Sequence, residues 1–345
     1  MSFTFIDLFA GIGGIRIAFE KFGGECVFSS EINENSIKTY EENFGETPFG
    51  DITKINSEDI PDFDILAGGF PCQAFSIAGK RLGFEDTRGT LFFEVARIIK
   101  DKNPKAFLLE NVKGLVNHKN GETLATILNI LKNDLKYYVP DPEVLNAKYF
   151  GVPQNRERII IVGFRKDICD KNFIFPKEKE ISIKLKDILE EKVDLKYFIS
   201  RKYLKTLEEH KKRHAKKGNG FGYEILDKNG VSNAIVVGGM GKERNLIIDK
   251  KSLRIDALKK LNLEIENNNK KNNDEKDISL PKRIINELQV RKLTPVEWSK
   301  LQGFPDDFKI IVKDTYAYEQ FGNSVAVPMI IAVAEKIIEK LERKE

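Results

Sequence analysis

One cysteine follows a short run of glycine and proline, the two residue types with special backbone conformations. Residues 68–77 read GGFPCQAFSI, which places Cys72 directly after Pro71 and close to two glycines. A free cysteine is most often a small buried hydrophobe, and the apolar run ECVF favours that interpretation for Cys26. The glycines and proline around Cys72 indicate a specific backbone conformation that packing alone does not require, and a helix expected to begin nearby would stabilise a thiolate. Cys72 is therefore a candidate nucleophile.

Two further groups could assist such a nucleophile. In LLENV, Glu110 follows apolar or neutral residues, a setting that favours a protonated carboxyl able to donate a proton. A surface carboxylate is the alternative. In QNRER, residues 154–158, Arg156 and Arg158 alternate along an extended segment and are expected to point the same way. Both could reach a phosphate or a base oxygen, or they could simply aid solubility.

The elements that must position these residues alternate through the first 165 residues. Short β-rich runs and amphipathic stretches predict strand–helix units around a parallel sheet. The predicted strands are FTFIDLFA, ECVFSSEI, FDILAGG, AFLLENV and RIIIVGF. Helices are predicted in GIRIAFEKFG and over about 91–100 and 122–133. The cysteine and the carboxylate each follow a predicted strand, so both are expected at the carboxyl edge of the sheet, where open α/β folds bind ligands.

The composition changes after about Pro176, which indicates a second domain. Residues 201–217, RKYLKTLEEHKKRHAKK, hold eight Lys or Arg against two Glu, so this stretch is either a solvated helix face or a surface that lies along phosphates. Residues 263–276 are almost entirely polar and are expected to be a flexible insertion. The apolar run VAVPMIIAVAEKIIEKL then predicts a helix in the first domain's core, so the second domain is inserted before it.

Composition excludes several classes of protein. With 41% hydrophobic and 32% charged residues, the 345-residue chain is expected to form one or two soluble domains. No run of about eighteen apolar residues and no leader pattern occurs, which predicts a cytoplasmic protein outside membranes. Three cysteines without a CxxC pair and three histidines without zinc spacing predict neither a disulfide framework nor a metal site. A net charge of +4 is too small to identify a partner.

A cofactor site is predicted in DLFAGIGG, residues 7–14, between a strand and a helix. Its glycines permit a tight turn, and the helix amino terminus offers free N–H groups. Glu31, at the end of the next strand, could accept hydrogen bonds from ribose hydroxyls, and Asp51 could bind an adenine amino group between the apolar faces of Phe9 and Ile52. The GxGG spacing departs from the dinucleotide fingerprint, so S-adenosylmethionine fits at least as well as NAD. A purely steric turn is the alternative.

Seven motifs in one order carry a family resemblance: DLFAGIGG, GGFPCQAFS, DTRGTLFFE, ENV, QNRER, LTPVEWSKLQGFP and QFGNSV. The set resembles that of the DNA (cytosine-5)-methyltransferases of bacterial restriction–modification systems, over residues 3–175 and 290–335. The resemblance implies an α/β fold: a Rossmann-like S-adenosylmethionine-dependent methyltransferase domain with a smaller inserted target-recognition domain. It implies a catalytic and cofactor-binding domain over 1–175, a target-recognition domain over 176–289, a return segment over 290–315 and a C-terminal helix over 316–345 that completes the catalytic domain.

The resemblance also implies a mechanism. Cys72 would attack carbon 6 of a cytosine flipped out of duplex DNA, so that carbon 5 takes a methyl group from S-adenosyl-L-methionine. Glu110 would donate to ring nitrogen 3, Arg158 would hold the base oxygen, and Arg156 would lie on a backbone phosphate. The cofactor residues implied are Phe9, Gly11, Gly13, Gly14, Glu31, Ile32, Asp51, Ile52, Leu91, Asn323 and Val325. Ile32 stands where some members carry an aromatic ring stacked on adenine.

DNA contacts are expected in two regions. The stretch 73–90 is similar to the family's loop that closes over the flipped base. Lys242 and Arg244 are plausible guanine readers, whereas Lys212 and His214 are expected on phosphate. The full set of expected DNA contacts is Gln73, Ser76, Lys80, Arg81, Arg88, Lys212, His214, Lys242 and Arg244.

The expected partners are double-stranded DNA with a short specific target and a companion restriction endonuclease, and the enzyme is expected to act as a monomer. Three alternatives stay open. A tRNA cytosine-5 methyltransferase would share the motifs, an NAD-dependent oxidoreductase rests on GIGG and Glu31 alone, and a non-catalytic DNA-binding protein would not need PCQ, ENV and QNRER.

Overall fold

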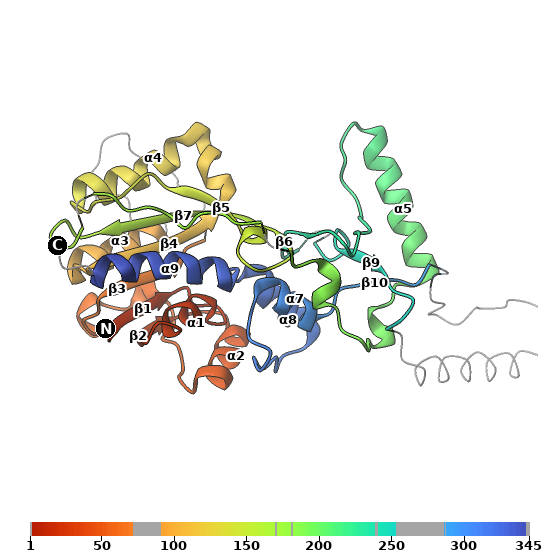
Figure 1. Cartoon of the computed structure of the whole chain (residues 1–345), viewed down its shortest axis with the longest axis horizontal. Helices are drawn as coiled ribbons and strands as arrows, with labels where there is room; N and C mark the ends of the chain where they lie inside the picture. The colour runs from red at the N-terminus through yellow and green to blue at the C-terminus, as the bar shows by residue number, and fades with distance from the viewer. Residues whose placement is uncertain are drawn as a thin grey trace, which may run out of the picture.

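The computed structural model describes residues 2–71, 91–169, 171–180, 182–238, 241–252, 286 and 288–342. In these ranges a six-stranded sheet has the order β2-β1-β3-β4-β7-β5 (Figure 1). Its strands are β1 (Phe3–Leu8), β2 (Gly24–Ser30), β3 (Ile65–Gly69), β4 (Ala106–Val112), β5 (Glu143–Asn146) and β7 (Glu157–Phe164). The five strands predicted from sequence are confirmed, and β5 was not predicted.

The predicted parallel sheet is correct for four strands and wrong for the fifth. Strands β1 to β4 pair in parallel, but β7 runs antiparallel to both β4 and β5. The connection from β5 to β7 spans only residues 147–156, which is too short for the crossover that a parallel pair requires. The reversal brings the beginning of β7 beside the end of β4, so Val112 pairs with Arg158.

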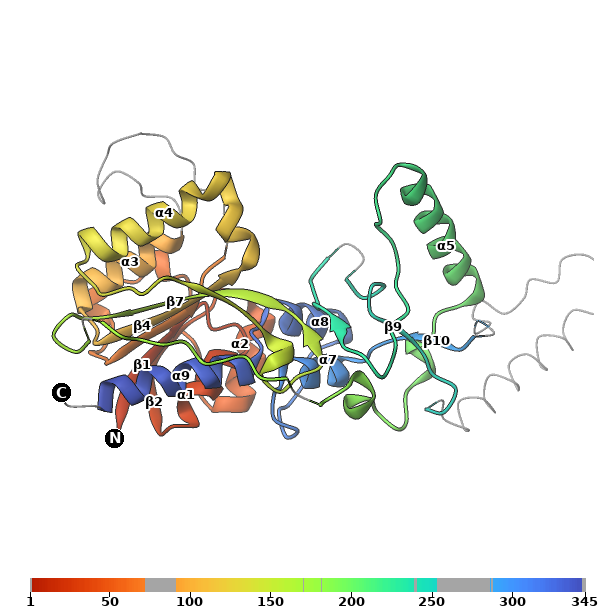
Figure 2. The same ribbon diagram turned by 45° about the horizontal axis from the view of Figure 1, so that its top comes forward.

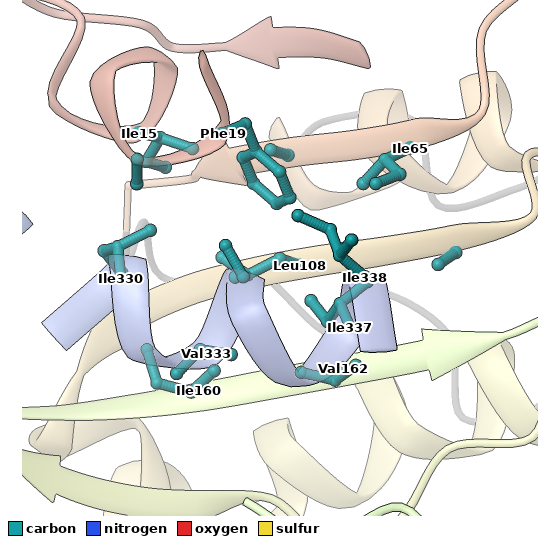
Figure 3. Close-up of a cluster of buried hydrophobic side chains, with 14 of the residues drawn as sticks. Ile15, Phe19, Ile65, Leu108, Ile160, Val162, Ile330, Val333, Ile337 and Ile338 are labelled. Atoms are coloured by element: carbon teal, nitrogen blue, oxygen red, sulfur yellow. The ribbon is translucent and has the colours of Figure 1, made fainter. Parts of the chain in front are cut away.

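Both faces of the sheet are buried, as continuous apolar strands require. Residues of one parity, such as Leu108 and Val162, face a cluster formed with α1 (Gly14–Glu20) and α9 (Val327–Glu342). Figure 3 shows Ile330, Val333 and Ile337 of α9 in this cluster. Residues of the other parity face a second cluster formed with α3 (Leu91–Lys102) and α4 (Glu122–Asn129). Because successive side chains of a strand point to opposite faces, each strand contributes residues to both hydrophobic clusters.

Local sequence explains where several helices begin and end. Asn33 caps α2 (Glu34–Phe44) by accepting from the N–H groups of Asn35 and Ser36, and Gly45 ends that helix in the left-handed conformation. A reciprocal pair of side chain to backbone bonds between Thr294 and Glu297 starts α7 (Pro295–Gln302). The third predicted helix is shorter than expected, because α4 passes into a wider turn over Ile130–Asp134.

A second group of elements lies beside the sheet in both views (Figures 1 and 2). It holds α5 (Arg201–Lys216), β8 (Ser232–Asn233), β9 (Leu246–Ile248) and β10 (Val290–Lys292). Strand β8 pairs with β6 (Gln154–Asn155), and β9 pairs with β10. The predicted insertion over 263–276 lies outside the described residues.

The chain then returns to the sheet through α7, α8 (Asp314–Asn323) and α9. The single C-terminal helix expected over 316–345 is two helices, since the backbone leaves the helical conformation at Ser324. The segment Asp314–Glu342 is long and apolar enough to cross a membrane, but most of it is buried inside the molecule, as a core helix would be. The prediction that the final apolar helix packs on the first domain is confirmed, because α9 packs against α1.

Candidate active site and cofactor pocket

A cavity of about 530 Å³ opens at the carboxyl ends of β1 to β4. Most of the residues predicted for catalysis and cofactor binding line it, although they come from segments as far apart as residues 9 and 325. The predicted residues that line it are Phe9, Gly11, Gly14, Glu31, Ile32, Leu91, Glu110, Arg156, Arg158, Asn323 and Val325. The order of the strands thus brings residues that are distant in the sequence together at one edge of the sheet.

The glycine turn forms one wall of the cavity. Gly11 (φ 55°) and Gly13 (φ 82°) both adopt the left-handed conformation. A β-carbon at Gly13 would lie 2.2 Å from Cε2 of Phe44, and one at Gly14 would lie 2.8 Å from Oγ of Ser324. The two glycines therefore allow the turn to pack against α2 on one side and against the segment after α8 on the other.

Glu31 joins the glycine turn to the end of β2. Its carboxylate accepts hydrogen bonds from the N–H groups of Gly11 (2.8 Å), Ile32 (2.8 Å) and Asn33 (2.7 Å). An ionised carboxylate has about four acceptor positions, so capacity is left for a hydroxyl donor. This arrangement fits a ribose, and it fixes the carboxylate before any ligand arrives.

Of the residues predicted to contact adenine, Ile32 lines the cavity, whereas Ile52 and Asp51 do not. Ile32 is 70% exposed and lines the cavity, so its side chain offers an apolar face. Ile52 is 2% exposed and packs in the core, which corrects the prediction that its side chain covers adenine. Asp51 is half-exposed outside the cavity lining, and hydrogen bonds from Thr53 lower the pKa of its carboxyl. It can therefore act as an ionised hydrogen-bond acceptor.

Glu110 and Arg158 form an ion pair in the cavity. The distance from Nε of Arg158 to Oε1 of Glu110 is 2.8 Å, and the two side chains are 12% and 11% exposed. Gly69 at the end of β3 leaves space beside this pair, because a β-carbon there would lie 3.4 Å from Oε2 of Glu110. The sequence suggested a carboxyl in apolar surroundings. The structure instead pairs it with a guanidinium, which is possible because β7 is antiparallel to β4.

Arg156 does not lie where the sequence predicted. Its side chain is 1% exposed, and its guanidinium donates to the carbonyl oxygens of Ile235 (2.8 Å), Gly322 (3.1 Å) and Ser324 (2.6 Å). Burial and the nearby charge of Arg158 lower the pKa of Arg156. The predicted phosphate contact is therefore wrong, since the side chain is buried and both of its terminal nitrogens donate to carbonyl oxygens inside the protein.

The structure adds residues that sequence reasoning missed. Asn111 is buried, and its Nδ2 donates to the carbonyl oxygen of Phe70 at 2.7 Å. It belongs to the motif ENV, but its partner, 41 residues away, gives no local signal. Val236 and Val237 also line the cavity, although they are 43% and 45% exposed and lie in the second group of elements.

The predicted DNA contacts are only partly within the described residues. Cys72, Gln73, Ser76, Lys80, Arg81 and Arg88 lie outside them, although Pro71, which precedes Cys72, lines the cavity.

Four predicted contacts are described. Lys212 is exposed on α5, and Arg244 is exposed between β8 and β9. The Nδ1 atom of His214 lies 2.8 Å from Oδ1 of Asn219. Lys242 is half-buried, and its Nζ lies 4.2 Å from the centre of the Tyr318 ring.

Comparison with a solved structure agrees with this fold. A crystal structure of a Spodoptera frugiperda DNMT2 mutant superposes with a TM-score of 0.69 at 24% identity, covering 99% of this chain and all of that one. The fold is thus that of the Rossmann-like methyltransferases.

Sequence similarity identifies the family. The model of the C-5 cytosine-specific DNA methylases matches residues 3–339. Type II methyltransferase M.HpaII of Haemophilus parainfluenzae is 57% identical over 98% of this chain and 90% of its own length. M1.ScrFI of Lactococcus lactis subsp. cremoris is 48% identical over 99% of this chain and 80% of its own length. The chain belongs to the C-5 cytosine-specific DNA methylase family, so it is an S-adenosylmethionine-dependent DNA methyltransferase that acts on carbon 5 of cytosine.

Proposed function

We propose that Cys72, Glu110 and Arg158 carry out the methyl transfer on a cytosine flipped out of duplex DNA. The observation that supports this assignment is the Glu110–Arg158 pair at 2.8 Å in the same cavity as the glycine turn. Pro71, which precedes Cys72 in the sequence, lines the same cavity and supports the assignment of Cys72. A carboxyl, a guanidinium and a thiol are the groups that nucleophilic addition to a pyrimidine ring requires.

Each residue has a distinct part in the reaction. The Cys72 thiolate forms a bond to carbon 6, while Glu110 supplies a proton at nitrogen 3 and Arg158 holds both the carboxyl and the base oxygen. Carbon 5 then accepts a methyl group and loses its proton to a base. The bond between carbon 6 and sulfur breaks to restore the thiolate, and nitrogen 3 returns its proton to Glu110. Extrusion of the base costs a few kcal/mol, which contacts in the cavity offset.

The cofactor residues fit S-adenosylmethionine. When bound, this cofactor supplies an electrophilic methyl group. Glu31 would accept from the ribose hydroxyls with its remaining acceptor capacity, and the exposed face of Ile32 would cover adenine. Asn323 and Val325 would line the methionine end of the cavity. The Asp51 carboxylate would accept a hydrogen bond from the adenine amino group.

We also propose that residues 176–289 read a short specific target in duplex DNA. Exposed Lys212 on α5 and exposed Arg244 support contact with DNA, since exposed cations can bind phosphates and base edges. The relatives named Type II methyltransferases support a companion restriction endonuclease for the same site. The enzyme would act as a monomer in the cytoplasm.

Covalent trapping tests the assignment of Cys72. In DNA that contains 5-fluorocytosine, the fluorine cannot leave carbon 5 as a proton does, so the adduct with sulfur persists. We expect a denaturation-resistant protein–DNA adduct that requires S-adenosylmethionine, and no adduct with Cys72→Ala. Cys169→Ala is the matched control because Cys169 is buried away from the cavity. Recovery of the adduct from Cys72→Ala would refute the assignment.

Sequencing of methylated DNA tests the reaction and its target together. Bisulfite or nanopore sequencing of a host genome that expresses this chain should show 5-methylcytosine at a single short motif. The same measurement with Cys72→Ala should show none. Methylation only of transfer RNA would contradict the choice of DNA as the substrate.

A further inference from the structure

Arg156 joins two segments that are far apart in the sequence and that both contribute residues to the cavity lining. Its Nη1 donates to Ile235, within the proposed target-recognition domain, at 2.8 Å. Its Nη2 donates to Gly322 and Ser324, at the end of α8, at 3.1 and 2.6 Å. The three acceptors are backbone oxygens, so Arg156 fixes the course of the chain in both segments and not merely two side chains.

The residues next to these acceptors face the cavity. Val236 and Val237 follow Ile235 and line the cavity, and Asn323 and Val325 flank Ser324 and line it as well. The first pair belongs to the proposed recognition domain, and the second pair belongs to the proposed methionine end of the cofactor site. The guanidinium of Arg156 therefore holds the segment proposed to contact DNA next to the segment proposed to contact the cofactor.

The two segments also touch without spare space. A β-carbon built on Gly322 would lie 2.8 Å from Cγ2 of Val237 and 3.3 Å from its backbone nitrogen. Both distances are shorter than an ordinary van der Waals contact. The two segments are thus packed closely at Gly322, and a displacement of one away from the other would break the bonds to Arg156.

Two buried glutamines complete the junction. Oε1 of Gln154 accepts from the N–H group of Ile235 at 3.0 Å, and Nε2 of Gln154 donates to Oε1 of Gln302 at 3.1 Å. Nε2 of Gln302 donates in turn to the carbonyl oxygens of Phe321 (2.6 Å) and Ser324 (3.1 Å). Both glutamines are fully buried. Because a buried polar group that loses its partner is costly, this network favours movement of the two segments as one unit.

We propose that Arg156 is a positioning residue that makes the binding of cofactor and the binding of DNA depend on each other. The inference rests on the proposed cofactor and recognition residues. A cofactor that orders residues 323–325 would also order Val236 and Val237 for DNA, and DNA that orders the valines would improve the cofactor site. By thermodynamic linkage, each ligand must raise the affinity of the other by the same factor.

Binding measurements test this linkage without turnover. The probes are S-adenosylhomocysteine and a duplex cut from a plasmid that the wild-type enzyme methylates. The Kd of S-adenosylhomocysteine is measured by titration calorimetry with and without saturating duplex, and the Kd of the duplex by fluorescence anisotropy with and without saturating S-adenosylhomocysteine. For the wild type we expect each ligand to tighten the other by the same factor, within about 5- to 150-fold.

Two variants should remove this factor by different routes. Arg156→Met deletes all the donors, and Gly322→Ala pushes Val237 away while the guanidinium remains. In both variants we expect the factor to fall to within about twofold of one. Tyr137→Phe is the matched control, because it deletes a buried hydrogen bond to the carbonyl oxygen of Pro104, at the opposite end of β4 from Glu110. It should keep the wild-type factor even if its Tm falls.

The outcomes separate a positioning role from a merely structural one. Equal weakening of both ligands with an unchanged factor in Gly322→Ala and Arg156→Met would overturn the proposal, as would a wild-type factor of one. If Arg156→Met does not fold, Gly322→Ala decides the question. Absence of S-adenosylhomocysteine binding to the wild type would overturn the proposed cofactor site as well, whereas binding with a factor of one overturns the linkage alone.

Discussion

Glu110 and Arg158 show how two ordinary charged residues become a reactive pair. Each stands at the end of a strand that faces the cavity, and both are largely withdrawn from water. At low exposure an ion pair is sensitive to geometry, because the loss of one partner leaves the other charge without compensation. The pair is therefore suited to hold a carboxyl in one orientation toward a base that arrives from DNA.

Glu110→Gln should separate chemistry from binding. The amide keeps the shape of the carboxyl but cannot supply an acidic proton to nitrogen 3, so methyl transfer should slow by about 10² to 10⁴. Binding of S-adenosylhomocysteine and of DNA should stay close to the wild type. Incorporation of tritiated methyl groups into DNA measures the rate. Glu157→Gln is the control, since Glu157 is half-exposed and pairs with Lys113 outside the cavity. Equal turnover in Glu110→Gln and the wild type would exclude Glu110 from the reaction.

Asp7 illustrates the cost of burying a carboxyl below the glycine turn. It is fully buried in β1, and burial raises the pKa of its carboxyl from 3.8 to about 8, against a smaller lowering by Arg16. Glu31 and Glu20 act in the same direction as burial. Between these two pKa values the folded protein keeps a proton that the unfolded chain has released. The free energy of unfolding therefore falls as the pH rises through this range.

Asp7→Asn should remove this part of the pH dependence. Relative to the wild type, the variant should gain stability as the pH rises from 6 to 8, by at most about 1.4 kcal/mol per pH unit. Urea unfolding at pH 6, 7 and 8 measures the difference. Asp62→Asn, at an almost fully exposed position, is the control and should run parallel to the wild type. A parallel profile for Asp7→Asn would show that Asp7 is ionised in the folded protein.

The turn between β1 and α1 requires glycines with positive φ and has no capping side chain. Gly13 caps α1 in the left-handed conformation without a capping side chain, and Phe44 of α2 fills the space that a β-carbon would need. The turn is therefore fixed by its neighbours as well as by its own sequence. A change in the conformation of this turn should also weaken cofactor binding, because Gly11 and Gly14 of the same turn line the cavity.

Gly13→Ala and Gly45→Ala separate strain from steric overlap. Both positions have positive φ, of 82° and 71°, so each alanine should cost about 1–2 kcal/mol of stability. Only Gly13→Ala also meets Phe44, at 2.2 Å, whereas Gly45 has open space around it. We expect Gly13→Ala to be the less stable variant and to lose affinity for S-adenosylhomocysteine. Equal stability and equal affinity in the two variants would contradict this account of the turn.

Across the whole molecule, a buried cation joins the second group of elements to α7. Arg291 of β10 is 0% exposed and lies 2.7 Å from both Asp249, after β9, and Glu297 of α7. Burial alone would raise the pKa of Asp249, but hydrogen bonds from Ser252 and Arg291 lower it to about 2. The junction therefore depends on charged groups that have no access to water.

Arg291→Met should weaken this junction. The change leaves two buried carboxylates without their cation, so the free energy of unfolding should fall by about 3–5 kcal/mol. Arg165→Met, which breaks an exposed pair with Asp167, should cost no more than about 1 kcal/mol. Chemical denaturation followed by circular dichroism measures both. A small effect of Arg291→Met would mean that apolar contacts alone hold the two parts together.

Local patterns in the sequence were enough to predict much of the fold. Short β-rich runs predicted five strands, amphipathic and apolar stretches predicted α1, α3 and α9, and the glycines at 11 and 13 predicted the tight turn. These features follow from short-range geometry, because side-chain direction repeats every two residues in a strand and about every 3.6 in a helix. The same patterns placed Glu110 and Glu31 at strand ends, where the cavity lies.

Only the tertiary structure decided which groups meet. The bonds of Arg156 reach residues 79, 166 and 168 positions away, so no local pattern could distinguish a buried junction from a phosphate contact. The direction of β7 and the burial of Ile52 were likewise set by packing between distant segments. The sequence by itself determined which residue types could do the chemistry and on which elements they stand. Folding determined their partners, because a side chain's hydrogen bonds depend on proximity in space.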